Sequence, residues 1–286
     1  MLAQRIITAL ILAPIVVFGT LFLSSFWFSL VVGIMVIIAS WEYCGLIKLS
    51  LFSNKSFYII VLLACAFLLA INPSILKVAL YFTLAWWIIA FFIVVSHPKN
   101  SNLINQNLSM GLINGLFLFV PMAASLAILH SQDRSFVLLL LLYIWASDIG
   151  AYFAGKRFGN KKLCPKVSPN KTWEGVYGGV ILTQLVAIAY VLSTIESPTL
   201  KDFLVFCFLA LLVSIVSILG DLFESVLKRI SDQKDSGNIL PGHGGLLDRI
   251  DSLTASAPVF LLFMVFVPVS YTHLRAHETR GNLVCR

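Results

Sequence analysis

Carboxylate side chains are concentrated in the second half of this 286-residue sequence, close to lysines, arginines and glycines. Carboxylate oxygens bind hard divalent cations such as Mg²⁺, which proteins usually hold with one or two carboxylates plus substrate phosphates. Cationic side chains and glycine N–H groups bind phosphate oxygens. Together these residue types indicate phosphoryl or nucleotidyl transfer. Eight of the 13 acidic residues form the set: Asp148, Glu174, Asp221, Glu224, Asp232, Asp235, Asp248 and Asp251.

The stretch ILGDLFESVLKR places four polar side chains on one face of an apolar helix. Asp221, Ser225 and Lys228 are spaced i, i+4 and i+7, and Glu224 is at i+3. An ionised aspartate facing lipid would cost several kcal/mol, so this face must contact protein or water. Two interpretations stay open, a ligand face for a metal or a structural salt bridge from Asp221 or Glu224 to Lys228.

The stretch LLDRIDSL repeats this arrangement at the start of the next apolar segment. Asp248, Asp251 and Ser252 are spaced i, i+3 and i+4. Acidic residues in a first helical turn also stabilise unpaired N–H groups and the helix dipole. Capping accounts well for one aspartate and less well for two on one face, directly after a glycine-rich turn.

That turn, PGHGG, exposes backbone N–H groups that suit the close approach of a phosphate. Gly244 and Gly245 are the candidates for this contact, and His243 either binds phosphate or braces the turn. A glycine turn alone is weak evidence for a site. The pattern GxxxxGK[ST] is absent, so a P-loop is not indicated.

A third stretch, SDIGAYFAGKRFGNKKLCPKVSPNKTWEG, combines Asp148 with six cations between residues 156 and 171. Most of these cations are typical of a cytoplasmic loop near anionic lipid headgroups. Lys171 is different, because it precedes a predicted helix start, where a cation is unfavourable unless an anion lies nearby.

The composition predicts that membrane helices position these residues. Only 12% of residues are charged, against roughly 25% in soluble domains, and the mean hydropathy is +0.94. A membrane span needs roughly 20 mostly apolar residues. We therefore predict an all-α integral membrane protein, a polytopic bundle of about nine transmembrane helices. They cover about 5–23, 26–47, 57–71, 75–95, 108–129, 136–154, 173–195, 202–227 and 254–270.

The distribution of lysine and arginine predicts the orientation of the bundle. With a cytoplasmic N-terminus, 14 of these residues lie on the cytoplasmic side and three on the other side before residue 271. The charged stretches then face the cytoplasm. The net charge of +7 reflects the same bias and does not indicate a nucleic-acid partner.

The chain divides into three predicted parts. Residues 1–135 supply N-terminal membrane helices, and residues 136–270 supply the catalytic helices with their cytoplasmic loops. Residues 271–286 form a polar tail with three arginines on the outer side, which is either an ordinary tail or non-native sequence.

The stretch SVLKRISDQKDSGNILPGHGGLLDRIDS closely resembles the signature of the phosphatidate cytidylyltransferase, or CDP-diacylglycerol synthase, family. The upstream SDIGAYFAGKRFGNKKL and SPNKTWEG segments are also similar, whereas the first half matches only as a set of membrane helices. The tail departs from the family pattern. The signature positions are Ser225, Lys228, Arg229, Lys234, Asp235, His243, Gly244, Gly245, Asp248, Arg249 and Asp251.

This resemblance implies that CTP and phosphatidic acid react to give CDP-diacylglycerol and pyrophosphate. It implies Mg²⁺, in a paired site that can also hold K⁺, and a location in a bacterial-type inner or plasma membrane, with membrane lipid as a partner and a homodimer left open. The implied metal ligands are Asp221, Asp248 and Asp251, with Asp148 as a helper, and Lys228 is implied in catalysis. The implied substrate-binding residues are Lys171, Ser225, Arg229, Lys234, His243, Gly244, Gly245 and Arg249.

Two other functions remain open at this stage. A CTP-dependent kinase, or a cytidylyltransferase acting on another membrane lipid, would use the same residue types; a kinase would transfer the γ-phosphoryl group and release CDP. A secondary transporter also buries acidic residues, but it places them near the membrane midplane on broken helices.

Overall fold

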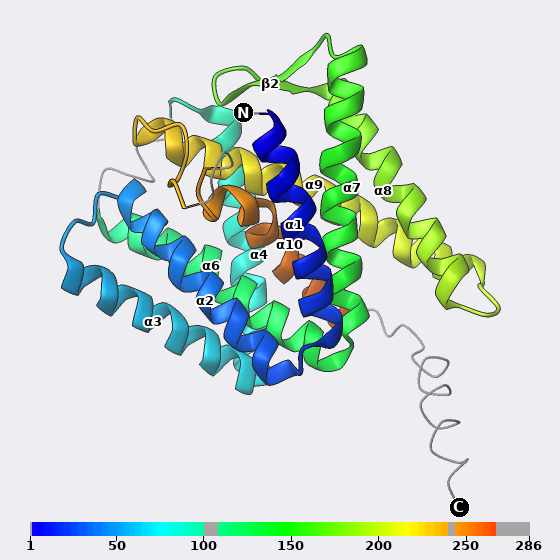
Figure 1. The fold of residues 1–286 in the computed structure, drawn as a ribbon, viewed down its shortest axis with the longest axis horizontal. Helices are drawn as coiled ribbons and strands as arrows, with labels where there is room; N and C mark the ends of the chain where they lie inside the picture. The colour runs from blue at the N-terminus through cyan, green and yellow to red at the C-terminus, as the bar shows by residue number, and fades with distance from the viewer. Residues whose placement is uncertain (1, 100–107, 240–243, 267–286) are drawn as a thin grey trace, which may run out of the picture.

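Helices account for most of the described chain, which comprises residues 2–99, 108–239 and 244–266 of a computed structural model. Nine α-helices and one small β-hairpin occur within these residues (Figure 1). The prediction of an all-α polytopic bundle is confirmed. The elements are α1 (Leu2–Phe22), α2 (Ser25–Leu46), α3 (Phe52–Ile71), α4 (Pro73–Ser96), α6 (Leu108–Gln132), α7 (Arg134–Phe158), β1 (Lys162–Cys164), β2 (Ser168–Thr172), α8 (Trp173–Thr194), α9 (Leu200–Ile230) and α10 (Leu247–Phe266).

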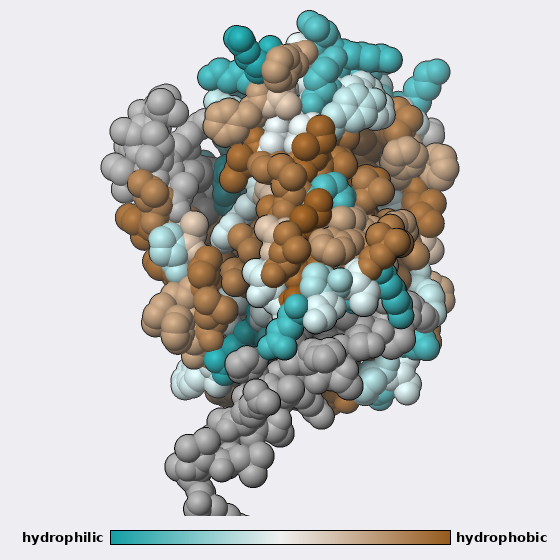
Figure 2. Space-filling view, turned by 90° about the vertical axis from the view of Figure 1, so that its right-hand side faces the viewer, coloured by the Kyte–Doolittle hydropathy of each residue, from teal (hydrophilic) through white to brown (hydrophobic). Residues whose placement is uncertain are grey.

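Seven of these helices, α2, α3, α4, α6, α7, α8 and α9, are long and apolar enough to cross a membrane. Large apolar side chains are exposed along the bundle, among them Phe57, Phe82 and Phe92. Figure 2 shows hydrophobic residues across the middle of one face, with hydrophilic residues gathered above and below them. Exposed apolar surface of this kind suits lipid rather than water as the surrounding solvent.

Helix α10 lies in the middle of the bundle, where it contacts α2, α4, α6, α7 and α9 (Figure 1). Its side chains from Leu253 to Leu262 are buried. The helix begins at Leu247, earlier than the predicted residue 254, because the charged turn with Asp248 and Asp251 is itself helical. Both predicted parts, 1–135 and 136–270, therefore supply neighbours of α10, and the division between them stays a prediction.

Small residues bring α7 and α8 into close contact. A methyl group at Gly150 of α7 would overlap the backbone of Gly178 in α8, and one at Gly179 would crowd the carbonyl of Ser147. Small residues at such positions let two membrane helices approach at backbone distance. This pairing fixes the base of the β1–β2 hairpin, which joins the two helices and lies at the same end of the bundle as the start of α1 (Figure 1).

The hairpin is a feature that the sequence did not predict. Its strands are antiparallel, with Lys162 opposite Thr172. Thr172 ends β2 and also caps α8, since its hydroxyl accepts a hydrogen bond from the Gly175 N–H at 3.2 Å. Before the hairpin, the last turn of α7 carries two cations, Lys156 and Arg157. The predicted tail, residues 271–286, lies outside the described residues.

Candidate active site

Three aspartates from three helices approach one another at the end of the bundle that carries the hairpin. Asp148 comes from α7, Asp221 from α9 and Asp251 from α10. Asp221 lies within electrostatic range of both Asp148 and Asp251. We call these three residues the acidic cluster. The predicted grouping of Asp148 with the aspartates of the two later helices therefore appears in the structure.

Lys171 supplies positive charge to the acidic cluster from strand β2. Its ammonium group lies 2.5 Å from a carboxylate oxygen of Asp221, and both side chains are partly exposed. The other Asp221 oxygen accepts a weak hydrogen bond of 3.4 Å from the Ser225 hydroxyl. Arg249 also lies within electrostatic range of Asp148. The sequence analysis expected an anion near Lys171, because a cation just before a helix start is otherwise unfavourable. In the structure that anion is Asp221.

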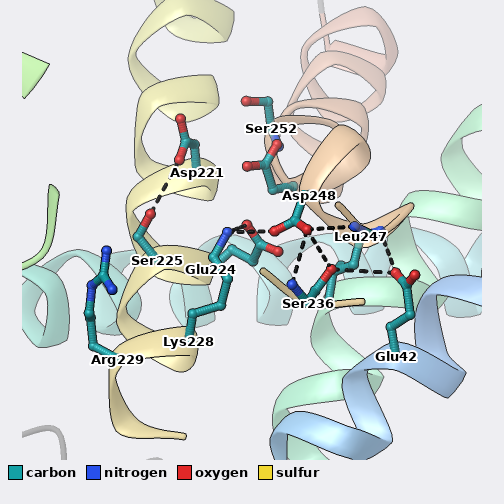
Figure 3. A network of polar contacts seen from close by, with 12 residues as sticks. Glu42, Asp221, Glu224, Ser225, Lys228, Arg229, Ser236, Leu247, Asp248 and Ser252 are labelled. Carbon is teal, nitrogen blue, oxygen red and sulfur yellow. Dashed lines mark hydrogen bonds and ion pairs between the residues drawn. The ribbon is translucent and has the colours of Figure 1, made fainter. Parts of the chain in front are cut away.

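Lys228 lies at the centre of a second group of charges, which Figure 3 shows together with Asp221 of the acidic cluster. Its ammonium group lies 2.8 Å from Glu224 and 2.6 Å from Asp248. The second oxygen of Asp248 accepts hydrogen bonds from the Ser236 N–H and hydroxyl at 3.0 Å and from the Gly245 N–H at 2.8 Å. We call Glu224, Lys228 and Asp248 the charge-paired cluster. The sequence analysis left open a structural salt bridge within α9 and capping by an aspartate at the start of α10. The charge-paired cluster contains both, as the Glu224–Lys228 ion pair and the hydrogen bond from the Gly245 N–H to Asp248.

These contacts separate Asp248 from the other predicted metal ligands. Both Asp248 oxygens are occupied, one by Lys228 and the other by three donors. Among the residues that the structure describes, no three His, Cys, Asp or Glu side chains are arranged to hold a metal ion. Mg²⁺ commonly takes only one or two carboxylates, with water and substrate phosphate completing its shell. The donors of the acidic cluster fit that chemistry, and the metal role of Asp248 stays a prediction.

The remaining predicted cations have different surroundings. The Arg229 Nε donates a hydrogen bond of 3.4 Å to the Val167 carbonyl, which ties α9 to the turn of the hairpin. Lys234 is exposed in the segment between α9 and α10. Arg249 is exposed in the first turn of α10. The structure therefore places Lys234 and Arg249 at the surface and gives Arg229 a structural contact.

The described part of the glycine turn borders the charge-paired cluster. Gly244 has φ of +81°, a conformation that side chains other than glycine rarely adopt. A methyl group there would also approach Asp248 at 2.7 Å. Gly245 uses its N–H for Asp248, so this group faces a carboxylate in the structure. The predicted residue His243 lies outside the described residues.

Glu42 in α2 is a part of this region that the sequence analysis missed. Its carboxylate accepts hydrogen bonds from the Leu246 N–H at 3.1 Å and the Leu247 N–H at 2.8 Å, at the start of α10 (Figure 3). One feature of the sequence could have indicated a role for Glu42, because it is the one acidic residue within the first five predicted spans.

Comparison with known proteins places the chain in a family. Residues 3–267 match the sequence model described as Cytidylyltransferase family, so the chain belongs to it. The phosphatidate cytidylyltransferase of Pseudomonas aeruginosa is 39% identical, over 91% of this chain and 96% of its own. The corresponding protein of Haemophilus influenzae is 36% identical, over 93% of this chain and 100% of its own. That of Rickettsia typhi is 33% identical, over 70% and 92%. The predicted resemblance is confirmed.

Proposed function

We propose that this chain transfers the cytidylyl group of CTP to phosphatidic acid, giving CDP-diacylglycerol and pyrophosphate. The observation that carries the proposal is the acidic cluster beside Lys171, at the polar end of membrane helices. A lipid phosphate and a water-soluble nucleotide can meet only at such a boundary. The three relatives described above, all named phosphatidate cytidylyltransferase, support the same reaction.

The reaction needs charge stabilisation more than proton transfer. The lipid phosphate is anionic near neutral pH, so its oxygen is a nucleophile without a strong general base. It attacks the α-phosphorus of CTP, the bond from that phosphorus to the bridging oxygen breaks, and pyrophosphate leaves with the bonding electrons. The barrier comes from repulsion between the two anions and from charge that develops on pyrophosphate, and fixed cations lower both.

Lys171 is the cation best placed for this role. Its side chain and that of its partner Asp221 are both partly exposed. It can therefore exchange a carboxylate oxygen for a phosphate oxygen without crossing the bundle. The further candidates for phosphate contact are Arg249, which is exposed and within electrostatic range of Asp148, and Lys234, which is exposed between α9 and α10. Lys228 is less suited to direct contact, since it is held between two buried carboxylates.

The acidic cluster would hold Mg²⁺, with Asp221 and Asp251 as the first ligands and Asp148 beside them. When bound, Mg²⁺ neutralises phosphate charge in the ground state and on the departing pyrophosphate. Nothing in the described contacts distinguishes K⁺ as a second ion, and that part stays a prediction.

The bundle is an integral membrane protein, and we propose that its active site faces the cytoplasm. The excess of lysine and arginine at this end of the bundle supports that orientation. Phosphatidic acid would enter sideways from the inner leaflet, and CTP would arrive from the cytoplasm. A homodimer stays a prediction.

The test uses purified protein in phosphatidic acid vesicles, with CTP labelled on either the α- or the γ-phosphate. We expect the α-label in the lipid and the γ-label in pyrophosphate, and we expect both to require Mg²⁺. A lipid kinase would instead place the γ-label in the lipid and release CDP. Substrate flux without CTP turnover would indicate a transporter. Either of these results would refute the proposal.

A further inference from the structure

The residue at the N-cap of α10, Leu246, has no side chain that can accept a hydrogen bond. The first N–H groups of a helix have no intrahelical partner and are usually satisfied by the side chain at the N-cap. Leu246 precedes the first residue of α10, and its apolar side chain cannot accept a hydrogen bond. The Leu246 and Leu247 N–H groups instead donate to Glu42, which lies about 200 residues earlier in α2.

Glu42 is buried, with 6% of its surface exposed. Both of its carboxylate oxygens accept hydrogen bonds, and the Ser236 hydroxyl lies 3.4 Å from one of them. The same hydroxyl lies 3.0 Å from Asp248. Within the described residues, the hydrogen bonds of Glu42 all come from backbone N–H and hydroxyl groups. Glu42 is therefore an acceptor for the start of α10 rather than one half of an ion pair.

Two glycines leave the room that Glu42 needs. A methyl group at Gly237 would overlap one Glu42 oxygen, and one at Gly245 would come within 2.6 Å of the other. A second tie lies one helical turn further along α2, where the Ser231 hydroxyl donates to the Leu46 carbonyl at 2.7 Å. The C-terminal end of α2 thus contacts the segment between α9 and α10 at both of its ends, at Ser231 and at Leu246.

We propose that Glu42 is a positioning residue, which caps α10 from a neighbouring helix and so fixes the helix that carries Asp248 and Asp251. These aspartates stand one and four residues after Leu247. A small shift of the helix start would change their distances to Lys228 and Asp221, and misplacement by about 1 Å can cost about 10²-fold in rate. This inference rests on the proposed function, because the rate in question is that of cytidylyl transfer.

The experiment compares Glu42→Gln with a matched control, Asp202→Asn. Asp202 also caps a helix with its carboxylate, accepting from the Thr199 N–H at 2.9 Å and the Thr199 hydroxyl at 2.6 Å at the start of α9. Two quantities are measured on each full-length protein in lipid–detergent micelles. The first is hydrogen exchange in the peptide that covers the first turn of α10. The second is kcat and KM for CTP, expressed per folded molecule.

We expect Glu42→Gln to accelerate exchange in the first turn of α10 at least about tenfold, since one capping interaction is worth about that factor. We expect kcat to fall at least about tenfold and KM for CTP to change less than about threefold, because the substrate contacts persist while the catalytic geometry is lost. Asp202→Asn should leave kcat and exchange in α10 unchanged. Gly237→Ala, whose methyl group would overlap the Glu42 carboxylate, should reproduce the Glu42→Gln result.

Three outcomes would overturn the proposal. Unchanged exchange in Glu42→Gln would show that Glu42 does not cap α10. Faster exchange with wild-type kcat would show that the cap does not position the aspartates. An equal loss of kcat in Asp202→Asn would indicate a general effect of stability. If Glu42→Gln does not fold, Gly237→Ala is compared with Asp202→Asn by the same two measurements. Failure of the proposed function is recognised separately, because the wild-type protein would then make no CDP-lipid.

Discussion

Replacing Asp248 with Asn removes one charge from the charge-paired cluster and keeps the size of the side chain. The Lys228 and Asp248 side chains are 14% and 7% exposed, so their 2.6 Å ion pair is shielded from water. The new amide can still accept from the Gly245 N–H, but it cannot neutralise Lys228. Lys228 keeps a single anionic partner in the described cluster, Glu224, at 2.8 Å.

The expected loss of stability follows from these contacts. Removing one partner of a buried ion pair costs about 3–5 kcal/mol when the other charge is left unpaired. Because Lys228 retains Glu224, we place the loss for Asp248→Asn lower, at about 2–3 kcal/mol. Activity should also fall, since Asp248 anchors Ser236 and Gly245 at the start of α10. A residue that acts only as a metal ligand predicts a different pattern, in which activity falls and the metal-free protein is no less stable.

The assay is equilibrium unfolding in mixed micelles without Mg²⁺, applied to a double-mutant cycle of Asp248→Asn and Lys228→Met. We expect a coupling free energy of at least about 1.5 kcal/mol between the two positions, in the range found for residues in contact. The control pair is Asp202→Asn with Lys228→Met, whose two sites lie on opposite ends of α9 and should be additive. Unchanged or increased stability of metal-free Asp248→Asn, together with lost turnover, would refute the structural role assigned to this carboxylate.

Three further predictions concern the rest of the site. Asp251→Asn should not lower the free energy of unfolding, because it removes like-charge repulsion with Asp221, but turnover in the CTP assay should fall about 10²-fold; near-normal turnover would exclude Asp251 as a ligand. Lys171→Gln should cost under about 1 kcal/mol of stability, since its ion pair is partly exposed, and should raise KM for CTP about tenfold; an unchanged KM would remove it from phosphate binding. Cys164 in β1 should react with an impermeant thiol reagent from the cytoplasmic side only, and labelling from outside sealed cells would reverse the orientation.

The features that could be predicted from the sequence are those with a local pattern. Apolar runs of span length predict the helices, and the i, i+4, i+7 spacing predicts that Asp221, Ser225 and Lys228 share a face. Hydropathy bounded the last apolar span at residue 254, whereas the i, i+3, i+4 spacing of Asp248, Asp251 and Ser252 predicted an earlier helical turn, which the structure has from Leu247. In the structure these aspartates are helical, and Asp248 accepts a hydrogen bond from the Gly245 N–H of the preceding turn.

The features that could not be predicted depend on contacts between distant residues. The hydrogen bond from Leu247 to Glu42 joins positions 205 residues apart, and no local spacing indicates it. The β1–β2 hairpin has strands of three and five residues without the alternation of apolar and polar side chains that marks a strand. The choice of partner for each lysine also depends on helix packing, which decides that Lys228 meets Asp248 and Lys171 meets Asp221.

The two groups of carboxylates in the site differ in how their negative charge is balanced, which suggests different roles for them. Asp248 has a cation at one oxygen and three hydrogen-bond donors at the other, so its charge is balanced before any substrate arrives. The three carboxylates of the acidic cluster have Lys171 and Arg249 as the cations within their electrostatic range. An excess of negative charge in a partly buried place is unfavourable unless a further cation binds there. We therefore propose that the acidic cluster binds the metal ion and substrate, and that the charge-paired cluster, which contacts Glu42 of α2 through Ser236, holds the acidic cluster in position.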